Sequence, residues 1–209
     1  MCVRCGTPTA LVAQLDIDAV VLVDGGTDIL LRGDESGLGT PEEDMTSLAA
    51  VAGLDGIERL VVCLGFGIDA YHGVCHAHVL ENLAALQRAG AYLGAFSVPA
   101  ASPEGAAYLD AVAHARAETP RWPSIVNGQI AAAIRGEFGD VRFTTRTQGS
   151  ELFVNPLMGL YFAVDLPGLA RGVGYLDRLE RTRDAHQVAA AIAEYRQTVG
   201  RRASRVIPH

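Results

Sequence analysis

The sequence predicts an α/β protein with three layers, in which a mostly parallel sheet carries helices on both faces, as in Rossmann-like folds. Short apolar runs rich in β-branched residues alternate with helical patterns, which is typical of successive β-α-β units. The apolar fraction is 49% and the aromatic fraction only 6%, so we expect a core of closely packed aliphatic side chains. We expect the 209 residues to form one domain, 1–209, with residues 1–15 peripheral or poorly ordered.

Each predicted element rests on a local pattern. Runs such as AVVLV and LVVCL, each followed by a glycine turn, predict strands over 19–23, 60–64, 92–98 and, from its alternation, 141–145. Apolar spacing and capping residues predict helices over 40–51, 72–88, 103–118, 124–136, 156–171 and 184–199. For the first of these helices, Thr40 is the expected cap, Pro41 the first helical residue, and Glu43 the residue that reaches back to the cap.

Composition excludes several classes of function. The net charge of -7 and the pI near 5.3 argue against a nucleic-acid partner, because phosphate binding depends on clustered cations. No apolar run approaches the roughly 18 residues that a membrane helix needs, and no signal peptide opens the chain. We therefore expect no membrane partner, a cytoplasmic location and reduced cysteines. All 17 basic residues are arginine, which excludes Schiff-base chemistry from a lysine and a standard P-loop.

The first group of candidate site residues follows the first predicted strand. Asp24 comes directly after the apolar run, so its carboxylate should project beyond the carboxyl end of the sheet, where ligands bind in open α/β folds. We predict a catalytic role for Asp24, and substrate binding by its neighbours Gly25, Gly26, Thr27, Asp28, Arg32, Asp34 and Glu35. The acidic members are also candidate ligands for a divalent cation. The structural alternative is a tight turn whose carboxylates bind nearby amides and pair with Arg32.

The second group follows the second predicted strand. Helical spacing puts His72 and His76 on one apolar stripe, with His78 pointing elsewhere, and the helix dipole lowers the expected pKa of Cys75. We predict catalytic roles for His72, Cys75 and His76, and substrate binding by Gly65, Gly67 and Asp69. Three interpretations stay open. Cys75 is a nucleophile with a histidine base; or His72 and His76 bind a metal with Asp69 or Asp24; or the histidines and the thiol are structural.

The third group lies near residue 150. Arg146 stands among small hydroxyl residues in TTRTQGS, which suits recognition of a phosphate or carboxylate. We predict substrate binding by Arg146 and by Asn155, although Asn155 before a proline also has the pattern of a helix cap. Near the N-terminus, Cys2 and Cys5 form a lone CxxC without the further ligands that zinc requires.

Three long segments of the sequence resemble a known family. VLVDGGTDILLRGDESGLGTPEEDM, LGFGIDAYHGVCHAH and TRTQGSELFVNPLM, in this order, are similar to the bacterial family catalogued as domain of unknown function 1152. The resemblance runs from about residue 18 to the C-terminus and implies a three-layer α/β domain, but no activity. It also implies an N-terminal glycine-rich strand–turn–helix that is lacking here. We therefore expect a shortened member or a missing half supplied by another chain, and a homo-oligomer or partner chain that covers the exposed sheet edge.

The leading hypothesis is an enzyme of hydrolase or lyase type that acts on a small anionic metabolite. Asp24 and the group of His72, Cys75 and His76 would perform acid–base or nucleophilic chemistry, and Arg146 would hold the anion. One alternative is a non-catalytic ligand-binding or regulatory subunit that works with another chain. The other is a metal-dependent hydrolase, so a divalent metal is a possible cofactor.

Overall fold

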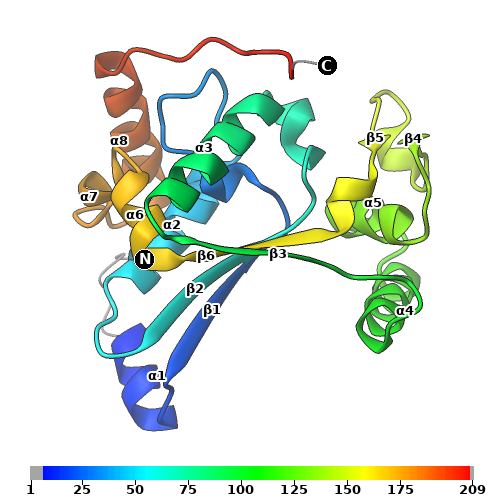
Figure 1. Cartoon of the computed structure of the whole chain (residues 1–209), viewed down its shortest axis with the longest axis horizontal. Helices are drawn as coiled ribbons and strands as arrows, with labels where there is room; N and C mark the ends of the chain where they lie inside the picture. Colours follow the sequence, from blue (N-terminus) through cyan, green and yellow to red (C-terminus); the bar gives the residue numbers. More distant parts are fainter. Residues whose placement is uncertain (1–6, 208–209) are drawn as a thin grey trace.

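The structure is a computed structural model that describes residues 7–207. A four-stranded sheet forms its centre (Figure 1). The strands of this sheet are β1 (Ala19–Asp24), β2 (Glu58–Cys63), β3 (Tyr92–Ser97) and β6 (Leu160–Asp165), and β4 (Gly139–Asp140) pairs with β5 (Phe153–Val154) in a small second sheet. The α-helices are α1 (Thr7–Leu15), α2 (Pro41–Ala52), α3 (His76–Arg88), α4 (Pro103–Glu118), α5 (Ile125–Ile134), α6 (Leu166–Gly172), α7 (Leu176–Leu179) and α8 (Ala185–Thr198). Short 3-10 turns are η1 (Asp28–Leu30), η2 (Ile68–His72), η3 (Thr145–Thr147) and η4 (Pro156–Gly159).

The sheet is mixed, which corrects the predicted mostly parallel arrangement. Its strand order is β1-β2-β6-β3, and only β1 and β2 pair in parallel. Strand β6 lies between β2 and β3 and pairs antiparallel with both. The predicted helix over 156–171 is therefore wrong over its central part. LYFAVD is rich in the aromatic and β-branched residues that strands favour. The start of the predicted segment forms the 3-10 turn η4, and only its end becomes α-helical, as α6.

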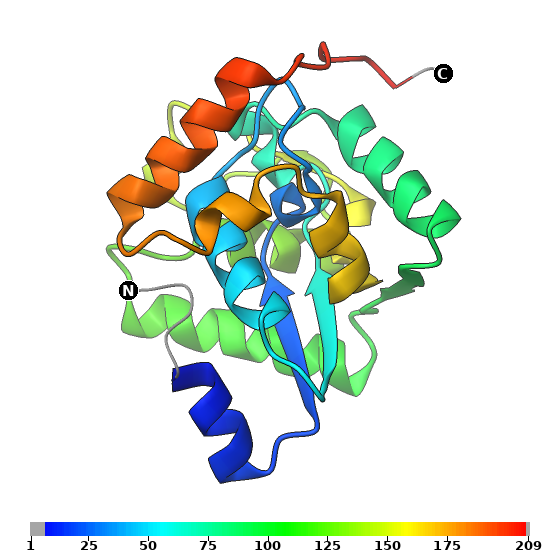
Figure 2. The same ribbon diagram turned by 90° about the vertical axis from the view of Figure 1, so that its left-hand side faces the viewer.

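The helices gather on one face of the sheet. Figures 1 and 2 show α2, α3, α6 and α8 on the same side of β1 and β2. Alternate residues of the strands, such as Val61 and Val164, point to that side and are fully buried. Together with Leu48 and Leu166 they belong to the principal core, as expected for one apolar face of a sheet under amphipathic helices.

The opposite face of the sheet is largely open among the described residues, so the predicted helices on both faces are not found. Val21 and Val23 on β1 are 49% and 64% exposed, and Phe96 on β3 is 53% exposed. Phe96 stacks on Tyr161 across the β3–β6 pair. This face is apolar and has no covering layer in the described part of the chain.

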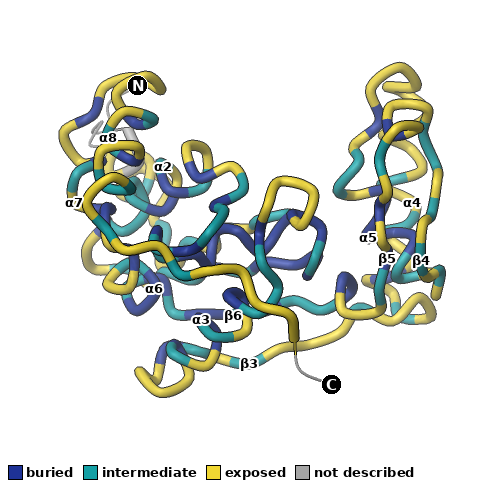
Figure 3. The backbone as a smooth tube through the Cα atoms, turned by 90° about the horizontal axis from the view of Figure 1, so that it is seen from above, coloured by how far each residue is buried: buried dark blue, intermediate teal, exposed yellow. Residues whose placement is uncertain are grey.

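A second, smaller packing unit lies beyond the ends of β3 and β6. It contains α4, α5, β4 and β5 and stands apart from the helical layer when seen from above (Figure 3). Its core includes Ile130, Val154 and Met158. The predicted strand over 141–145 is wrong: the pairing residues are Gly139 and Asp140, and 145–147 form the turn η3.

The remaining sequence predictions agree with the structure to different degrees. The strand over 19–23 and the helix over 103–118 are confirmed as β1 and α4, and the helix over 184–199 as α8. The helix predicted from residue 72 begins later, at His76, after the turn η2. Of residues 1–15, the segment 7–15 forms α1. Residues 1–6, which include Cys2 and Cys5, lie outside the described residues.

Candidate functional site

Four aspartates from four different segments converge at the carboxyl ends of β1 and β2. Asp24 ends β1, Asp28 begins η1, Asp44 lies in the first turn of α2, and Asp69 lies in η2. One carboxylate oxygen from each of Asp24, Asp28 and Asp44 lies within 4.8 Å of the other two. Asp69 joins them, because its Oδ2 accepts a hydrogen bond of 2.8 Å from the backbone N–H of Thr27. We call these four residues the carboxylate cluster.

Hydrogen bonds and glycines hold the carboxylate cluster together. Asp28 Oδ2 accepts bonds from the backbone N–H and the hydroxyl of Thr40, at 2.8 and 3.1 Å. Thr40 occupies the predicted cap position, but its side chain binds Asp28 instead of the helix, so the predicted capping box does not form. At Gly26, an added Cβ would lie 2.8 Å from oxygens of both Asp28 and Asp69. A side chain at this position would push the carboxylates apart.

The negative charge of the carboxylate cluster is not balanced within the described part of the chain. Asp24 Oδ2 and Asp44 Oδ2 are buried and have no hydrogen-bond partner, whereas buried polar atoms are normally paired. None of the four aspartates takes part in an ion pair among residues 7–207. An uncompensated buried charge is costly, so the cluster must gain protons or bind a cation.

The electrostatics of the cluster follow from this imbalance. Burial, followed by repulsion from Asp28, raises the pKa of Asp24 from 3.8 to about 6. Burial and the neighbouring carboxylates also raise the pKa of Asp44, and a hydrogen bond with Asp28 adds to this effect. The pKa of Asp69 is raised by burial and by Asp28, against the opposing hydrogen bond from Thr27. None of these shifts has a basic side chain among its main causes.

A small cavity leads to the cluster. It has a volume of about 190 Å³ and is lined by Leu22, Val23, Asp24, Ile29, Glu43, Asp44 and Ser47. Asp24 and Asp44 therefore border open space, whereas Asp28 and Asp69 are buried behind them. A ligand of a few atoms would reach the two aspartates that carry unpaired oxygens.

The donor set of the carboxylate cluster fits a hard divalent cation. Mg²⁺, Mn²⁺ and Ca²⁺ prefer oxygen ligands, and carboxylates supply both the ligand atoms and the compensating charge. Asp24, Asp28 and Asp44 would hold such an ion. Asp28 is among the acidic residues that the sequence predicts as candidate ligands of a divalent cation, and Asp24 is predicted as a ligand beside the histidines. The set contains neither His72 nor His76, the histidine ligands of the transition-metal alternative.

Asp34 and Glu35 belong to a different environment from the carboxylate cluster. The Arg202 guanidinium donates to Asp34 Oδ1 and to Glu35 Oε1, both at 2.7 Å. Glu35 is completely buried and also accepts bonds from the backbone N–H groups of Arg32 and Gly33. These acids therefore hold the C-terminal tail in place through Arg202. The Arg32 side chain does not pair with them and lines a separate cavity with Asn82 and Arg171.

The tail also covers the predicted nucleophile. Cys75 Sγ donates to the carbonyl of Arg205 and accepts a bond from its N–H. Partial burial opposes ionisation, but hydrogen bonds from the N–H groups of Arg205 and His78 leave the pKa of Cys75 lowered. His72 is exposed, so it does not continue the buried face as predicted. His78, expected to point elsewhere, is fully buried and its Nε2 lies 3.0 Å from the carbonyl of Ala203.

His76 and Asn155 meet at Gly67. A Cβ at Gly67, whose φ is +91°, would lie 2.6 Å from His76 Nε2 and 3.2 Å from Asn155 Nδ2. The His76 ring packs edge-on against Phe66, and burial lowers its pKa. Asn155 accepts from the N–H of Leu157, as a cap does, and donates to the carbonyl of Phe66. Both side chains stabilise the turn after β2.

The other predicted binding residues divide between the two packing units. Gly65 lies in the turn after β2, beside the carbonyl of Gly25, and a Cβ on Gly25 would meet Val126 of α5. Arg146 is exposed; it donates to the carbonyl of Pro123 and lies over the ring of Trp122. The structure therefore does not bring Arg146 to the carboxylate cluster.

Asp44 is the site residue that the sequence analysis missed. Asp44 belongs to a run of three acids, Glu42 to Asp44, which is typical of a first helical turn. The signal was the spacing: Asp44 lies four residues before Leu48, which is fully buried, so both lie on the face that packs towards β1. In a β-α unit the first helical turn lies near the carboxyl end of the preceding strand.

Comparison with known proteins places the chain in a family. A family profile described as "Protein of unknown function (DUF1152)" matches residues 9–198. The chain belongs to this family, as the resemblance of its three segments predicted. No curated protein and no solved structure gives a significant match. Within residues 7–207, the helices are too short or too polar to span a bilayer.

Proposed function

We propose that this protein is a divalent-cation-dependent enzyme of hydrolase or lyase type and that the carboxylate cluster is its catalytic centre. The observation that carries the proposal is the pair of buried, unpartnered oxygens on Asp24 and Asp44, within a group of acids that forms no ion pair among residues 7–207. Such an arrangement destabilises the folded chain unless protons or a bound cation compensate the charge. Unfavourable, uncompensated charge of this kind is typical of functional sites.

The substrate class follows from the size and charge of the site. The cavity beside Asp24 has a volume of only about 190 Å³. It therefore admits a small polar group of the substrate but not a large substrate molecule. A bound cation would attract an anionic group of the substrate and polarise it as a Lewis acid. Asp24 would be one of the residues that hold this cation, and because its pKa of about 6 lies close to neutral pH, protons would compete with the cation for its carboxylate.

A metal-free acid–base site is the second candidate, because burial and repulsion among the carboxylates raise the pKa values of both Asp24 and Asp44. In this case Asp44 stays protonated near neutral pH and donates a proton, while Asp24 accepts one. Pairs of carboxyls with separated pKa values can divide acid and base roles in this way.

One experiment tests both candidates. The purified protein is assayed against a panel of small phosphorylated and carboxylated metabolites, with Mg²⁺ or Mn²⁺ and with EDTA. The proposal expects turnover that needs the cation and is lost in Asp24→Asn and Asp44→Asn, but not in Asp110→Asn on the exposed surface of α4. Turnover that survives EDTA and follows a pKa near 6 would select the metal-free site. Full activity in both cluster variants would refute both candidates.

We also propose that another protein surface covers the open face of the sheet. Val21 and Val23 on β1, and Leu93 and Phe96 on β3, are each about half exposed or more, and exposed apolar surface favours association. A second copy or a partner chain would cover them, and a monomer at high concentration in a sizing experiment would exclude the second copy. A cytoplasmic location and the absence of a nucleic-acid partner stay predictions.

A further inference from the structure

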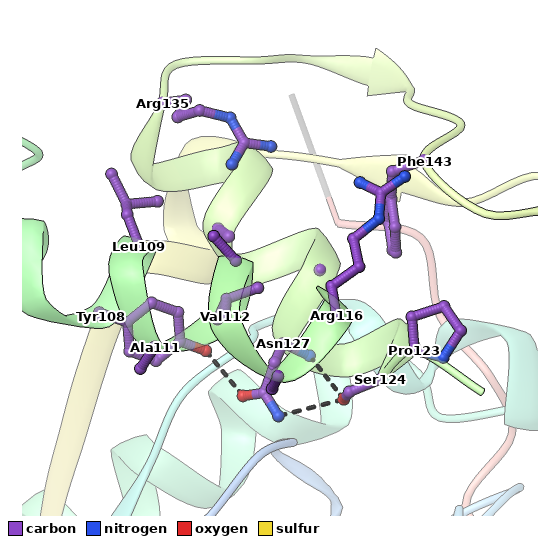
Figure 4. A pocket seen from close by; sticks show the side chains of 14 residues that line it. Tyr108, Leu109, Ala111, Val112, Arg116, Pro123, Ser124, Asn127, Arg135 and Phe143 are labelled. Atoms are coloured by element: carbon purple, nitrogen blue, oxygen red, sulfur yellow. Dashed lines mark hydrogen bonds between the residues drawn. The ribbon is translucent and has the colours of Figure 1, made fainter. Parts of the chain in front are cut away.

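A second hollow, unrelated to the carboxylate cluster, lies between α4 and α5 in the smaller packing unit (Figure 4). Its volume is about 470 Å³, within the range of roughly 300–1,000 Å³ that is usual for small-molecule sites. The walls are mainly apolar and include Leu109 and Val112 from α4, Ala131 from α5, and Phe143. Only Gly105 is fully buried along helix α4, which shows that this helix buries little of its surface.

The polar groups of this hollow form a short chain along its floor. The Tyr108 hydroxyl donates to Asn127 Oδ1 at 2.8 Å, and Asn127 Nδ2 donates to Ser124 Oγ at 3.1 Å (Figure 4). Burial raises the pKa of Tyr108 above its usual range, so the hydroxyl stays neutral. The second amide hydrogen of Asn127 and the hydroxyl hydrogen of Ser124 are left available for a ligand.

The charged groups that line the hollow are both arginines. Arg116 comes from α4 and Arg135 from the end of α5. Arg116 forms no ion pair or hydrogen bond with any other residue in 7–207. Arg135 uses Nε to bind Glu137, which leaves its terminal nitrogens available. Among the described residues no acidic side chain lines the hollow, so its charge is complementary to an anion.

The shape of the hollow is fixed by close packing at one wall. Gly128 faces the ring of Phe143, and a Cβ at this position would lie 2.1 Å from the ring. Arg146 binds the carbonyl of Pro123, which lines the same hollow. The arginine that sequence analysis assigned to anion binding therefore supports a wall of this hollow.

We propose that the hollow between α4 and α5 binds a small amphiphilic anion, a molecule with an apolar body and a carboxylate or phosphate group. The apolar body lies against Leu109, Val112 and Phe143. Arg116 binds the anionic group. Its side chain extends away from Asn127 and Ser124 in Figure 4, so these two donors face a different part of the ligand. This inference is independent of the carboxylate cluster and of its proposed chemistry.

The test uses octanoate as the anionic probe and octanol as its uncharged counterpart. Binding is followed by NMR titration of backbone amides in the full chain. We expect saturable shifts in α4 and α5 with octanoate, and weaker binding of octanol. Arg116→Gln should weaken octanoate binding about tenfold, the effect of one lost charge-assisted hydrogen bond, and leave octanol unchanged. The matched control is Arg121→Gln, an exposed arginine outside the hollow.

A second pair of variants tests the position of the site. Val112→Phe fills the hollow and should reduce the affinity for both probes at least about tenfold, whereas Ala107→Phe, on the exposed side of α4, should not. Far-UV circular dichroism verifies that both variants keep their helices. The proposal is overturned if octanoate gives no saturable shifts, if the shifts lie outside this unit, or if Arg116→Gln weakens both probes equally.

Discussion

Two groups of acids, separated by only a few residues, have opposite environments in this protein. Asp34 and Glu35 are neutralised by Arg202, and Glu35 also accepts bonds from backbone N–H groups and from Asn82. Asp24 and Asp28 belong to a cluster in which two buried oxygens lack partners and with which no arginine of residues 7–207 forms an ion pair. The first group has a complete structural explanation. The second does not, and this difference separates a stabilising network from a candidate site.

The two groups of acids differ in whether an arginine compensates their negative charge. Arg202 reaches Asp34 and Glu35 from a distance of more than 160 residues along the sequence, as part of a tail that also contacts Cys75. No arginine is provided for the carboxylate cluster among the described residues, although the chain has 17 of them. We infer that the missing positive charge is supplied by a bound cation.

The largest expected effect concerns cation affinity. Asp24→Asn and Asp44→Asn should each weaken binding of Mn²⁺ about a hundredfold, because each removes a charged oxygen ligand. Isothermal titration at pH 8 measures this directly. Asp110→Asn keeps the same change of charge at an exposed position and should bind as the wild type does. Equal affinities in all the variants would place the cation elsewhere.

The pH dependence of stability gives the next effect. The pKa of Asp24 is raised in the folded protein, from 3.8 to about 6, so its protonated form is favoured by folding. Its contribution to stability is present below about pH 4 and is lost as the pH rises through 6, which amounts to about 3 kcal/mol. The raised pKa values of Asp69 and Asp44 extend the loss to higher pH.

Urea unfolding in EDTA between pH 4 and pH 8 measures this decrease. Mn²⁺ should restore stability at pH 8 and have little effect at pH 4, where protons occupy the carboxylates. In EDTA at pH 8, Asp24→Asn should be more stable than the wild type. A wild-type stability that rises from pH 4 to pH 8 without a cation would contradict the account.

A substitution at Gly39 tests whether Asp28 is a cation ligand in the carboxylate cluster, because an added Cβ there would meet the Asp28 side chain. Gly39 has a φ of +68°, and a Cβ there would lie 2.2 Å from Asp28 Oδ2. Gly39→Ala should cost about 2 kcal/mol and also reduce cation affinity. Gly56 has a similar φ of +78° but open space around it, so Gly56→Ala reports backbone strain alone. If the two variants bind Mn²⁺ equally, Asp28 is not a ligand.

The smallest expected effect on stability comes from removing Arg202, which neutralises Asp34 and Glu35. Arg202→Gln should lower the free energy of unfolding by about 1–2 kcal/mol, because Arg202 is partly exposed and Glu35 keeps its other hydrogen-bond donors. It should also loosen the tail and increase the rate at which Cys75 reacts with a thiol reagent. Cation affinity should not change. A variant with the wild-type thiol reaction rate would show that Arg202 does not hold the tail over Cys75.

The sequence predicted the elements formed by local patterns and missed those set by tertiary context. Strand β1 and helix α4 carry clear periodicity and capping residues, and their predicted positions hold. The sequence predicts a helix in place of β6, because Asn155 and Pro156 have the pattern of a helix start. In the structure they begin the short turn η4, which ends at Gly159. The insertion of β6 between β2 and β3 depends on contacts far apart in the chain, and this made the sheet mixed.

The candidate site was predictable only in part. Asp24, Asp28 and Asp69 were recognised because each follows a strand, and the structure brings them together. Asp34 and Glu35 had the same sequence pattern, but the partner that neutralises them lies in the distant tail. His72 was placed on the buried face by helical spacing, yet Gly73, whose φ is +83°, ends the turn before α3 begins. Spacing rules do not apply across such a break.

The most direct test of the central claim is anomalous scattering from crystals of the protein grown at pH 8 with Mn²⁺. A peak bounded by the carboxylates of Asp24, Asp28 and Asp44 is the predicted result. The claim is contradicted if millimolar Mn²⁺ gives no peak there, or if a basic side chain occupies the space between these oxygens.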